Sequence, residues 1–328
     1  MHTPNAFPDA VRLCAGAHGE TLSVISGDGR PENDPQNSSA AATASQEVFP
    51  GITLAYIDVH TPACSLARAQ AGRCFEIHHC RQGRMEREWR EKYCYLGAGD
   101  LSIANSADMN ERAYFPLSHY HGIGICIDVD RAPECLSCLL DDVNVSPRAL
   151  AAKFCSGPQC FIARSNAGIE HIFAEIYQVP DRIKKGYLKV KILELLLFLS
   201  GLDANGSQAG ERCASRTQAA LAKEVCAHLA ANMDRRITLE ELSARLHVSG
   251  TQIKSSFKLV YGISLYAYTR TLKMEAAAMM LANTDRPILE IAGRFGYDNG
   301  SKFAKAFRDV MGASPTGFRA QARTGRIF

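Results

Sequence analysis

The sequence predicts an α+β fold, with a strand-rich N-terminal half and an all-helical C-terminal half. Three observations lead to this prediction. Residues 49–130 alternate apolar and polar side chains and are rich in β-branched residues, which is typical of short strands in a sandwich or small barrel. Residues 216–322 instead repeat apolar side chains at helical spacing. Residues 216–328 are also basic, with 17 Lys and Arg against 9 Asp and Glu, whereas residues 1–215 carry a net charge of −5.

The length of 328 residues fits two domains. Residues 1–46 are weakly patterned, and we expect a disordered or mobile N-terminus there. Residues 47–202 are expected to form a β-rich domain that ends in a helical hairpin, with helices over 167–179 and 182–202 separated by Pro180. Residues 203–215 are rich in Gly, Ser and Asn and predict a linker, and residues 216–322 predict the helical domain.

Residues 238–260 predict a first helix-turn-helix unit. Thr238 is a suitable N-cap, and Glu241 three residues later completes the pattern of a capping box. A short break at 247–249 separates two amphipathic helices. Their apolar faces carry Leu239, Leu242 and Leu246, then Ile253, Phe257 and Val260. Two short helices across a tight turn are the arrangement that places the second helix in a DNA major groove.

Residues 287–311 repeat this arrangement about fifty residues later. Pro287 suits the first helical position, and Gly296 permits a turn with positive φ. Either Asp298 or Asn299 is expected to cap the second helix, whose apolar face carries Phe303, Phe307, Val310 and Met311. The residues between the units predict one continuous linker helix along Leu265, Tyr268, Leu272, Ala276 and Met279.

The order of these residues resembles the AraC/XylS family of transcription regulators. The resemblance spans residues 219–320 and is carried by three segments: Ile-Ala-Gly-Arg-Phe-Gly-Tyr at 291–297, Ser-Lys-Phe-Ala-Lys-Ala-Phe-Arg at 301–308 and Gly-Ala-Ser-Pro-Thr-Gly-Phe-Arg at 312–319. It implies an effector-responsive regulator, more often an activator, that binds double-stranded promoter DNA and contacts RNA polymerase. It also implies a cupin-like barrel as the N-terminal fold. The helical hairpin then either forms a homodimer or packs on its own sheet.

The resemblance also implies where DNA is read. The matching positions on the two recognition helices are Thr251, Lys254 and Ser255, and Gly300, Ser301 and Lys305. The predicted contact set is completed by Gln252, Lys258, Asn299, Lys302 and Arg308. Ser255 is short and Gly300 replaces a polar residue, so the second helix is expected mainly to grip phosphates through Lys302 and Arg308. The two helices would enter successive major grooves about 34 Å apart.

A second resemblance, in the N-terminal half, is to regulators of siderophore uptake, and it makes an iron–siderophore chelate a candidate effector. Its candidate binding residues are Glu76, His78, His119 and His121. The histidines either contact a ligand or pack at a loop edge. The alternative function is a metal-dependent cupin-type enzyme or metal sensor fused to a DNA-binding domain. The signature of cupin enzymes is His-x-His followed closely by Glu. In this sequence the residue after His121 is glycine and no glutamate follows closely, so the signature is absent and we predict no catalytic residues, metal or cofactor.

Twelve cysteines are expected to be free thiols in a reducing compartment. Cys135 and Cys138 have zinc-ligand spacing, but the second pair, Cys155 and Cys160, is more widely spaced. Some DNA-repair regulators join this kind of DNA-binding domain to a reactive cysteine, but their alkyl-acceptor segment, of the Pro-Cys-His-Arg type, is absent from this sequence. We find no secretion signal and no apolar run long enough to cross a membrane, so the protein is expected to be cytoplasmic and to have no membrane partner.

Overall fold

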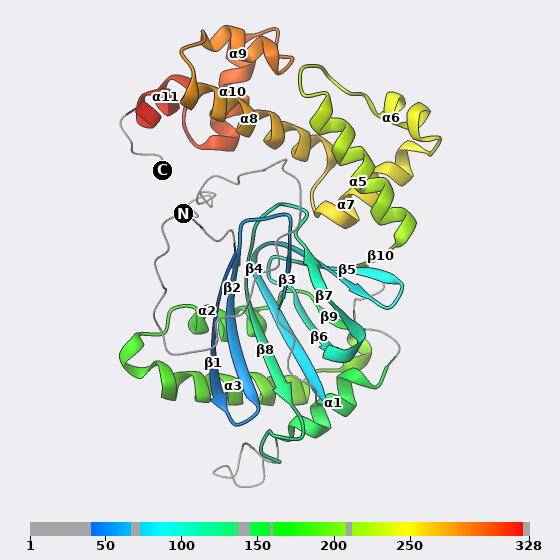
Figure 1. Cartoon of the computed structure of the whole chain (residues 1–328), viewed down its shortest axis with the longest axis vertical. Coiled ribbons are helices and arrows are strands. Elements are labelled where there is room, and N and C mark those ends of the chain that lie inside the picture. The colour runs from blue at the N-terminus through cyan, green and yellow to red at the C-terminus, as the bar shows by residue number, and fades with distance from the viewer. Residues whose placement is uncertain are drawn as a thin grey trace. The chain divides into compact units, whose positions relative to one another are not determined.

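The computed structural model describes residues 41–66, 73–134, 136, 145–157, 160–207 and 212–323. They belong to two compact units, and the second unit begins at Thr217. Strands dominate the N-terminal unit, whereas the described part of the C-terminal unit is helical (Figure 1). No helix in the described residues is both long and apolar enough to cross a bilayer.

The N-terminal unit contains a ten-stranded antiparallel sheet. Its strands are β1 (Ala41–Phe49), β2 (Ile52–Val59), β3 (Ala63–Ser65), β4 (Cys74–Trp89), β5 (Lys92–Gly97), β6 (Leu101–Asn105), β7 (Met109–Tyr114), β8 (Tyr120–Asp128), β9 (Phe161–Ala163) and β10 (Cys213–Ser215). The longest path through the sheet is β1-β2-β8-β4-β5-β10. β1 begins within the segment predicted to be mobile, and β10 lies within the predicted linker. Residues 1–40 lie outside the described residues.

Strand β4 belongs to both halves of this sheet. Its first part, Phe75 to His79, pairs with β6 and β8, and its second part, Arg84 to Trp89, pairs with β5 and β7. The sequence predicted two strands here, separated at 81–83. The chain instead continues through a register shift and Gly83, whose φ is 82°, as expected for a bulge that bends a strand. The described pairings leave the sheet open, so the predicted cupin-like barrel is not confirmed.

Three helices pack on the half of the sheet formed by β1, β2, β8 and the first part of β4. They are α1 (Pro147–Cys155), α2 (Ala167–Ile176) and α3 (Lys184–Gly201), and Figure 1 shows α3 running across the strands. Ser146 and Asn166 cap α1 and α2 by accepting backbone N–H bonds. Buried apolar side chains of the strands and helices share one core, which includes Ile77, Ile125, Phe173, Ile192, Leu195 and Leu196. The predicted hairpin is therefore present and covers a sheet face.

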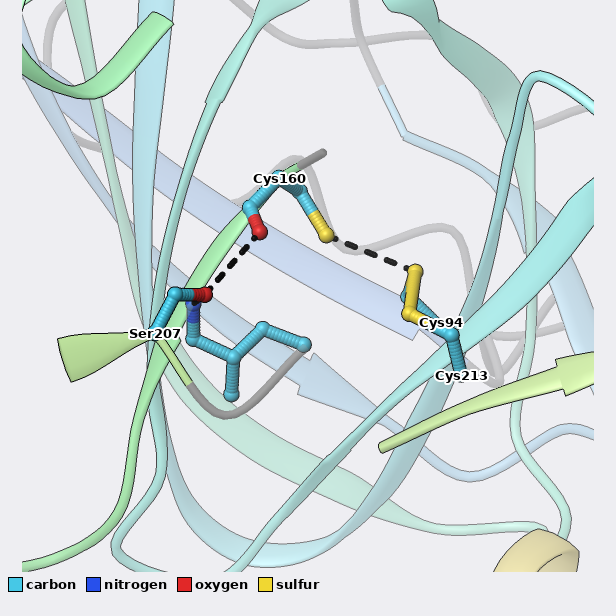
Figure 2. The surroundings of a disulfide bond; sticks show 5 residues. Cys94, Cys160, Ser207 and Cys213 are labelled. Atoms are coloured by element: carbon cyan, nitrogen blue, oxygen red, sulfur yellow. Dashed lines mark hydrogen bonds between the residues drawn. A yellow bond between two sulfur atoms is a disulfide. The ribbon is translucent and has the colours of Figure 1, made fainter. Parts of the chain in front are cut away.

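A second core lies under the other half of the sheet and contains several cysteines. Cys94 of β5 and Cys213 of β10 are paired residues of adjacent strands and form a disulfide, drawn in Figure 2. The expectation of free thiols is therefore wrong for this pair, because strand pairing brings the two side chains together. Cys135 and Cys138, which had zinc-ligand spacing, lie outside the described residues.

The C-terminal unit contains α5 (Arg216–Ala231), α6 (Leu239–Leu246), α7 (Gly250–Tyr261), α8 (Leu265–Asn283), α9 (Ile288–Arg294), α10 (Gly300–Met311) and α11 (Pro315–Arg323). The predicted linker helix is the single helix α8, which packs against α7 and also against α9, α10 and α11. Tyr268 and Leu272 are buried as expected, but Met279 is 58% exposed. Two pairs of short helices are thus held on one central helix (Figure 1).

Candidate nucleic-acid interface

The first pair of helices, α6 and α7, is bounded by side-chain caps. The Thr238 hydroxyl accepts a hydrogen bond from the Glu241 N–H at 3.2 Å, and the Ser249 hydroxyl accepts one from the Gln252 N–H at 3.2 Å. Between them His247 ends α6 with a left-handed φ of 54°. The Glu241 carboxylate binds Arg235 at 2.9 Å. The predicted N-cap is confirmed, whereas nothing in the sequence pattern indicated the conformation of His247.

The second pair, α9 and α10, has the same plan with a different turn residue. Gly296 has a φ of 77°, as predicted. Asn299 caps α10, since its side-chain oxygen accepts bonds from the N–H groups of Ser301 at 2.8 Å and Lys302 at 3.2 Å. Pro287 stands at the N-cap of α9, one position before the expected one. Both turns therefore use a left-handed residue followed by a polar cap, which directs the second helix away from the first.

Aromatic clusters hold the second helix of each pair in place. In the first pair, the rings of Phe257 and Tyr261 are stacked with centroids 4.4 Å apart, and Tyr268 of α8 meets Phe257 edge-on at 5.3 Å. In the second pair, Phe307 packs between Phe303 and Phe318 at 5.8 and 5.5 Å. These contacts fix the side of α7 and α10 that faces inward, and so decide which side chains face solvent.

Lys273 of α8 joins the two pairs. Its side chain is only 8% exposed, and its ammonium donates to the carbonyl oxygens of Arg235 and Phe295, each at 2.9 Å. Arg235 precedes α6 and Phe295 follows α9, so one buried cation ties together the start of the first unit and the turn of the second. Burial lowers the pKa of Lys273, and the charge of Asp234 opposes that shift. A second tie is the ion pair between Arg270 of α8 and Asp309 of α10.

Residues 242–321 match a family model described as a helix-turn-helix domain. This region is a helix-turn-helix domain. The chain is 37% identical over 101 residues to YdiP, an uncharacterized HTH-type transcriptional regulator of Escherichia coli (strain K12), and that match covers 31% of this chain and 33% of YdiP. It is 29% identical over 99 residues to the MmsAB operon regulatory protein of Pseudomonas aeruginosa, covering 30% of this chain and 32% of that protein.

Solved structures give matches of similar extent. The C-terminal domain of AraT, a response regulator from Geobacillus stearothermophilus, is 32% identical and covers 31% of this chain and 84% of its own, with a TM-score of 0.30. The DNA-binding domain of AdpA, solved with a target DNA, is 27% identical and covers 32% of this chain and 95% of its own, with a TM-score of 0.31. The chain thus spans about a third of the length of the two curated regulators described above.

The predicted contact residues lie on the recognition helices α7 and α10 or at their caps. All of them are exposed except Gly300, which is half-buried near Leu289; the exposed ones are Thr251, Gln252, Lys254, Ser255, Lys258, Asn299, Ser301, Lys302, Lys305 and Arg308. Within the described residues the five cations of this set form no ion pair. Unpaired cations on two helices of the same build are suited to contact with a polyanion.

The predicted effector residues fall into two separate groups. Glu76 and His78 are buried on β4, where their side chains are 3.0 Å apart and Arg87 lies 3.6 Å from the Glu76 carboxylate. Burial alone would raise the pKa of Glu76, but the hydrogen bond with His78 and the charge of Arg87 lower it to about 2. The sequence did not indicate Arg87, because it lies eleven residues further along the same bent strand.

His121 lies at the start of β8, a different part of the sheet, and His119 directly precedes that strand. His78 pairs with Gly124 of β8, whereas His121 pairs with Gln82, so the two groups are about 10 Å apart along the strand. His121 instead meets Asp58, its register partner on β2, at 3.1 Å. The same Asp58 oxygen is 3.0 Å from His60. Pairing of β2 with β8 creates this group, and sequence spacing gave no sign of it.

Two hollows open on the N-terminal unit, and neither is lined by the predicted effector residues. One has a volume of about 280 Å³ and lies between the start of β4 and α1, with Arg73 and Arg148 among its lining residues. The other has a volume of about 490 Å³ and is lined by Glu88, Arg90, Asp108, Met109, Asn110 and Glu111. The first is close to the smallest size expected for a small-molecule site.

Proposed function

We propose that this chain is a sequence-specific DNA-binding transcription regulator, an effector-responsive activator in which the N-terminal unit is the sensor. The observation that carries the proposal is the pair of capped recognition helices, α7 and α10, fixed to one helix and presenting unpaired cations. Similarity of this domain to named regulators supports it. Promoter DNA is then the partner, and activation requires contact with RNA polymerase.

The test is a gel shift with the full-length chain and the DNA upstream of its own gene. Preferred binding over random competitor DNA supports the proposal, and equal binding to both contradicts it. Lys254→Ala and Lys305→Ala then separate two kinds of contact. Loss of a lysine that reads a base is expected to cost about 1–3 kcal/mol of binding free energy and to change sequence preference. Loss of a lysine that contacts only phosphate is expected to weaken binding to all sequences alike.

A salt series completes this experiment. Loss of one phosphate contact is expected to reduce the slope of log K against log salt by about one. Lys185→Ala is the matched control, because Lys185 is an exposed lysine of the N-terminal unit. If neither recognition-helix variant differs from this control, α7 and α10 are not the DNA-contacting helices.

The proposal includes a homodimer formed through α3. Ile183, Val190 and Leu197 are 51%, 63% and 42% exposed, and each follows the last by seven residues. Because two helical turns take about seven residues, Val190 and Leu197 lie on one side of α3, and with Ile183 at its N-cap they make up an exposed apolar stripe. The opposite side of α3 is buried on the sheet. The helix therefore packs on its own sheet and also leaves a second apolar stripe for a partner helix, which combines the two roles that the sequence left open.

An iron–siderophore chelate is the proposed effector class, on the strength of the resemblance of residues 75–122 to siderophore-uptake regulators. Trp89, the single tryptophan, is buried on β4 and provides a fluorescence probe of the N-terminal unit. Titration with ferric and iron-free siderophores is expected to change this fluorescence saturably only with the ferric form. No response to any ferric chelate would remove this effector class and leave DNA recognition intact.

A second candidate function, a metal sensor, is favoured by Asp58, His60 and His121. One Asp58 oxygen lies 3.0 and 3.1 Å from the two imidazoles, and the three ligand atoms all lie within 4.8 Å of one another. Neighbouring ligands of a six-coordinate ion at about 2.1 Å are themselves about 3 Å apart. Burial lowers the pKa of His121 against the opposing charge of Asp58. Stoichiometric metal in the purified protein that is lost in Asp58→Asn would favour this function.

A further inference from the structure

Three sulfur atoms meet where the linker joins the sheet (Figure 2). Cys94 and Cys213 form the disulfide between β5 and β10, and the Cys160 thiol, just before β9, lies 3.4 Å from the Cys94 sulfur. All three sulfurs are within 4.8 Å of one another. Cys94 and Cys160 are 6% and 4% exposed. The cluster is therefore a buried disulfide with a third cysteine in contact with one of its sulfurs.

Backbone interactions fix this arrangement. Cys213 faces Cys94 because the two are register partners in the β5–β10 pair. Cys160 is positioned by Ser207, whose hydroxyl donates to the Cys160 carbonyl at 3.4 Å and accepts from the Ile162 N–H at 3.2 Å. The dashed contacts in Figure 2 show both the sulfur approach and this hydroxyl. A thiol in contact with a disulfide sulfur is within reach of thiol–disulfide exchange once its side chain turns into line with the disulfide bond.

We propose that Cys94, Cys160 and Cys213 form an intramolecular thiol–disulfide exchange site that holds or releases β10. Cys160 loses its proton to solvent, and its thiolate attacks the Cys94 sulfur. The Cys94–Cys160 bond forms as the Cys94–Cys213 bond breaks, and the electron pair leaves on the Cys213 sulfur, which takes up a proton. The number of disulfides is unchanged, so no external oxidant or reductant is consumed.

The exchange changes what holds the linker. β10 has three residues and pairs with β5. Without the disulfide, its side-chain attachments at the two ends are Arg212 to Asp100 and Arg216 to Glu88, each at 3.0 Å. α5 begins at Arg216, directly after β10. The covalent state of the cluster thus decides how firmly the sheet holds the segment that leads into the helix-turn-helix domain. This regulatory consequence rests on the proposed function, whereas the exchange itself does not.

Burial of the Cys160 thiol limits the rate of the exchange. Burial raises the pKa of the Cys160 thiol to about 11, so the thiol is protonated at neutral pH and is protected from oxidation until it attacks.

The bond between Cys94 and Cys213 argues against a metal, because a zinc site would require thiolates on both residues, which the structure joins to each other. Zinc binding to the reduced cluster is therefore an outcome that the experiment has to distinguish.

The test is trapping on the full-length protein by incubation with N-ethylmaleimide, followed by peptide mass spectrometry. Exchange exposes a Cys213 thiol that the maleimide captures, so wild-type protein is expected to gain label at Cys213 and a Cys94–Cys160 cross-link over time. Cys160→Ser is expected to lose both signals. Cys155→Ser, a free cysteine outside the cluster, is the matched control and should behave as wild type. Absence of label at Cys213, or equal label in Cys160→Ser, overturns the proposal.

Two further measurements complete the design. Cys213→Ser, oxidised with glutathione disulfide so that its two remaining cluster thiols join as Cys94–Cys160, is expected to show faster amide hydrogen exchange over residues 213–215 than Cys160→Ser. One zinc per reduced chain, lost in Cys160→Ser, would overturn exchange in favour of a thiolate metal site. If trapping succeeds but the two variants bind promoter DNA equally, the chemistry holds and its regulatory role fails. If wild type shows no preference for promoter DNA, it is the proposed function that fails.

Discussion

At the scale of single residues, Lys273 has the most consequence for the DNA-binding unit. Lys273→Met keeps most of the side-chain volume but leaves the carbonyl oxygens of Arg235 and Phe295 without their buried donor. We expect a loss of about 1–3 kcal/mol in the free energy of unfolding. Chemical denaturation measures it, with Lys258→Met at an exposed position as the control. Equal stability of the two variants would mean that Lys273 is not a structural tie.

Glu275 of α8 predicts how the stability of the same unit depends on pH. One of its carboxylate oxygens is buried without a hydrogen-bond partner among the described residues, and burial raises its pKa from 4.5 to about 8. Between pH 4.5 and 8 the folded state therefore keeps a proton that the unfolded state releases. The free energy of unfolding is at its highest below pH 4.5 and falls as the pH rises through 8. In that range the free energy of unfolding is expected to change by up to about 1.4 kcal/mol per pH unit.

Glu275→Gln should remove this contribution, because a neutral amide does not titrate. We expect the variant to be more stable than wild type at about pH 8, and the difference to shrink towards about pH 5. Thermal unfolding across that range measures both. An unchanged pH dependence would show that the carboxylate finds a partner or water in solution.

At the scale of elements, α3 carries a prediction about assembly. Val190→Asp places a charge in the middle of the stripe formed by Ile183, Val190 and Leu197. We expect the dimer dissociation constant to rise by about tenfold or more, since burying an unpaired carboxylate costs more than about 1.4 kcal/mol. Sedimentation or light scattering over a concentration series measures it. Lys185→Asp puts the same side chain at another exposed position of α3, and equal dimerisation of both variants would exclude this stripe as the interface.

The elements also show what the sequence was able to predict. Both helix-turn-helix units follow from local chemistry: helical spacing of apolar residues, an oxygen-bearing cap, and Gly296 where φ is positive. The bend in strand β4 could not be predicted, because a glycine such as Gly83 is equally compatible with a turn between two strands and with a bulge within one strand. The Asp58–His121 contact and the Cys94–Cys213 bond depend on strand register between distant segments. One-dimensional spacing contains no information about that register.

At the scale of the whole molecule, charge and cysteine usage follow the division into two units. Residues 216–328 carry a net charge of +8, and Cys226 is their single cysteine. Residues 1–215 carry −5 and the other eleven cysteines. This division fits a chain in which one unit meets a polyanion and the other contains the reactive groups. The direct junction of β10 with α5, from Ser215 to Arg216, is then the covalent route from the sulfur cluster to the helical unit.

The uninterrupted helix α8 also has a consequence for promoter architecture. Its 19 residues extend about 28 Å. With α7 and α10 each contacting one short DNA segment, or box, as proposed, a stiff spacer rather than a flexible tether sets the distance between the two boxes. Inserting about five base pairs between the boxes moves one of them to the opposite side of the duplex, and inserting about ten restores the side but adds a full turn. We expect both insertions to abolish high-affinity binding in a footprinting assay, whereas a tethered pair of domains would tolerate the longer one. Promoters recognised by this chain should therefore vary in base sequence more freely than in the number of base pairs between their two boxes.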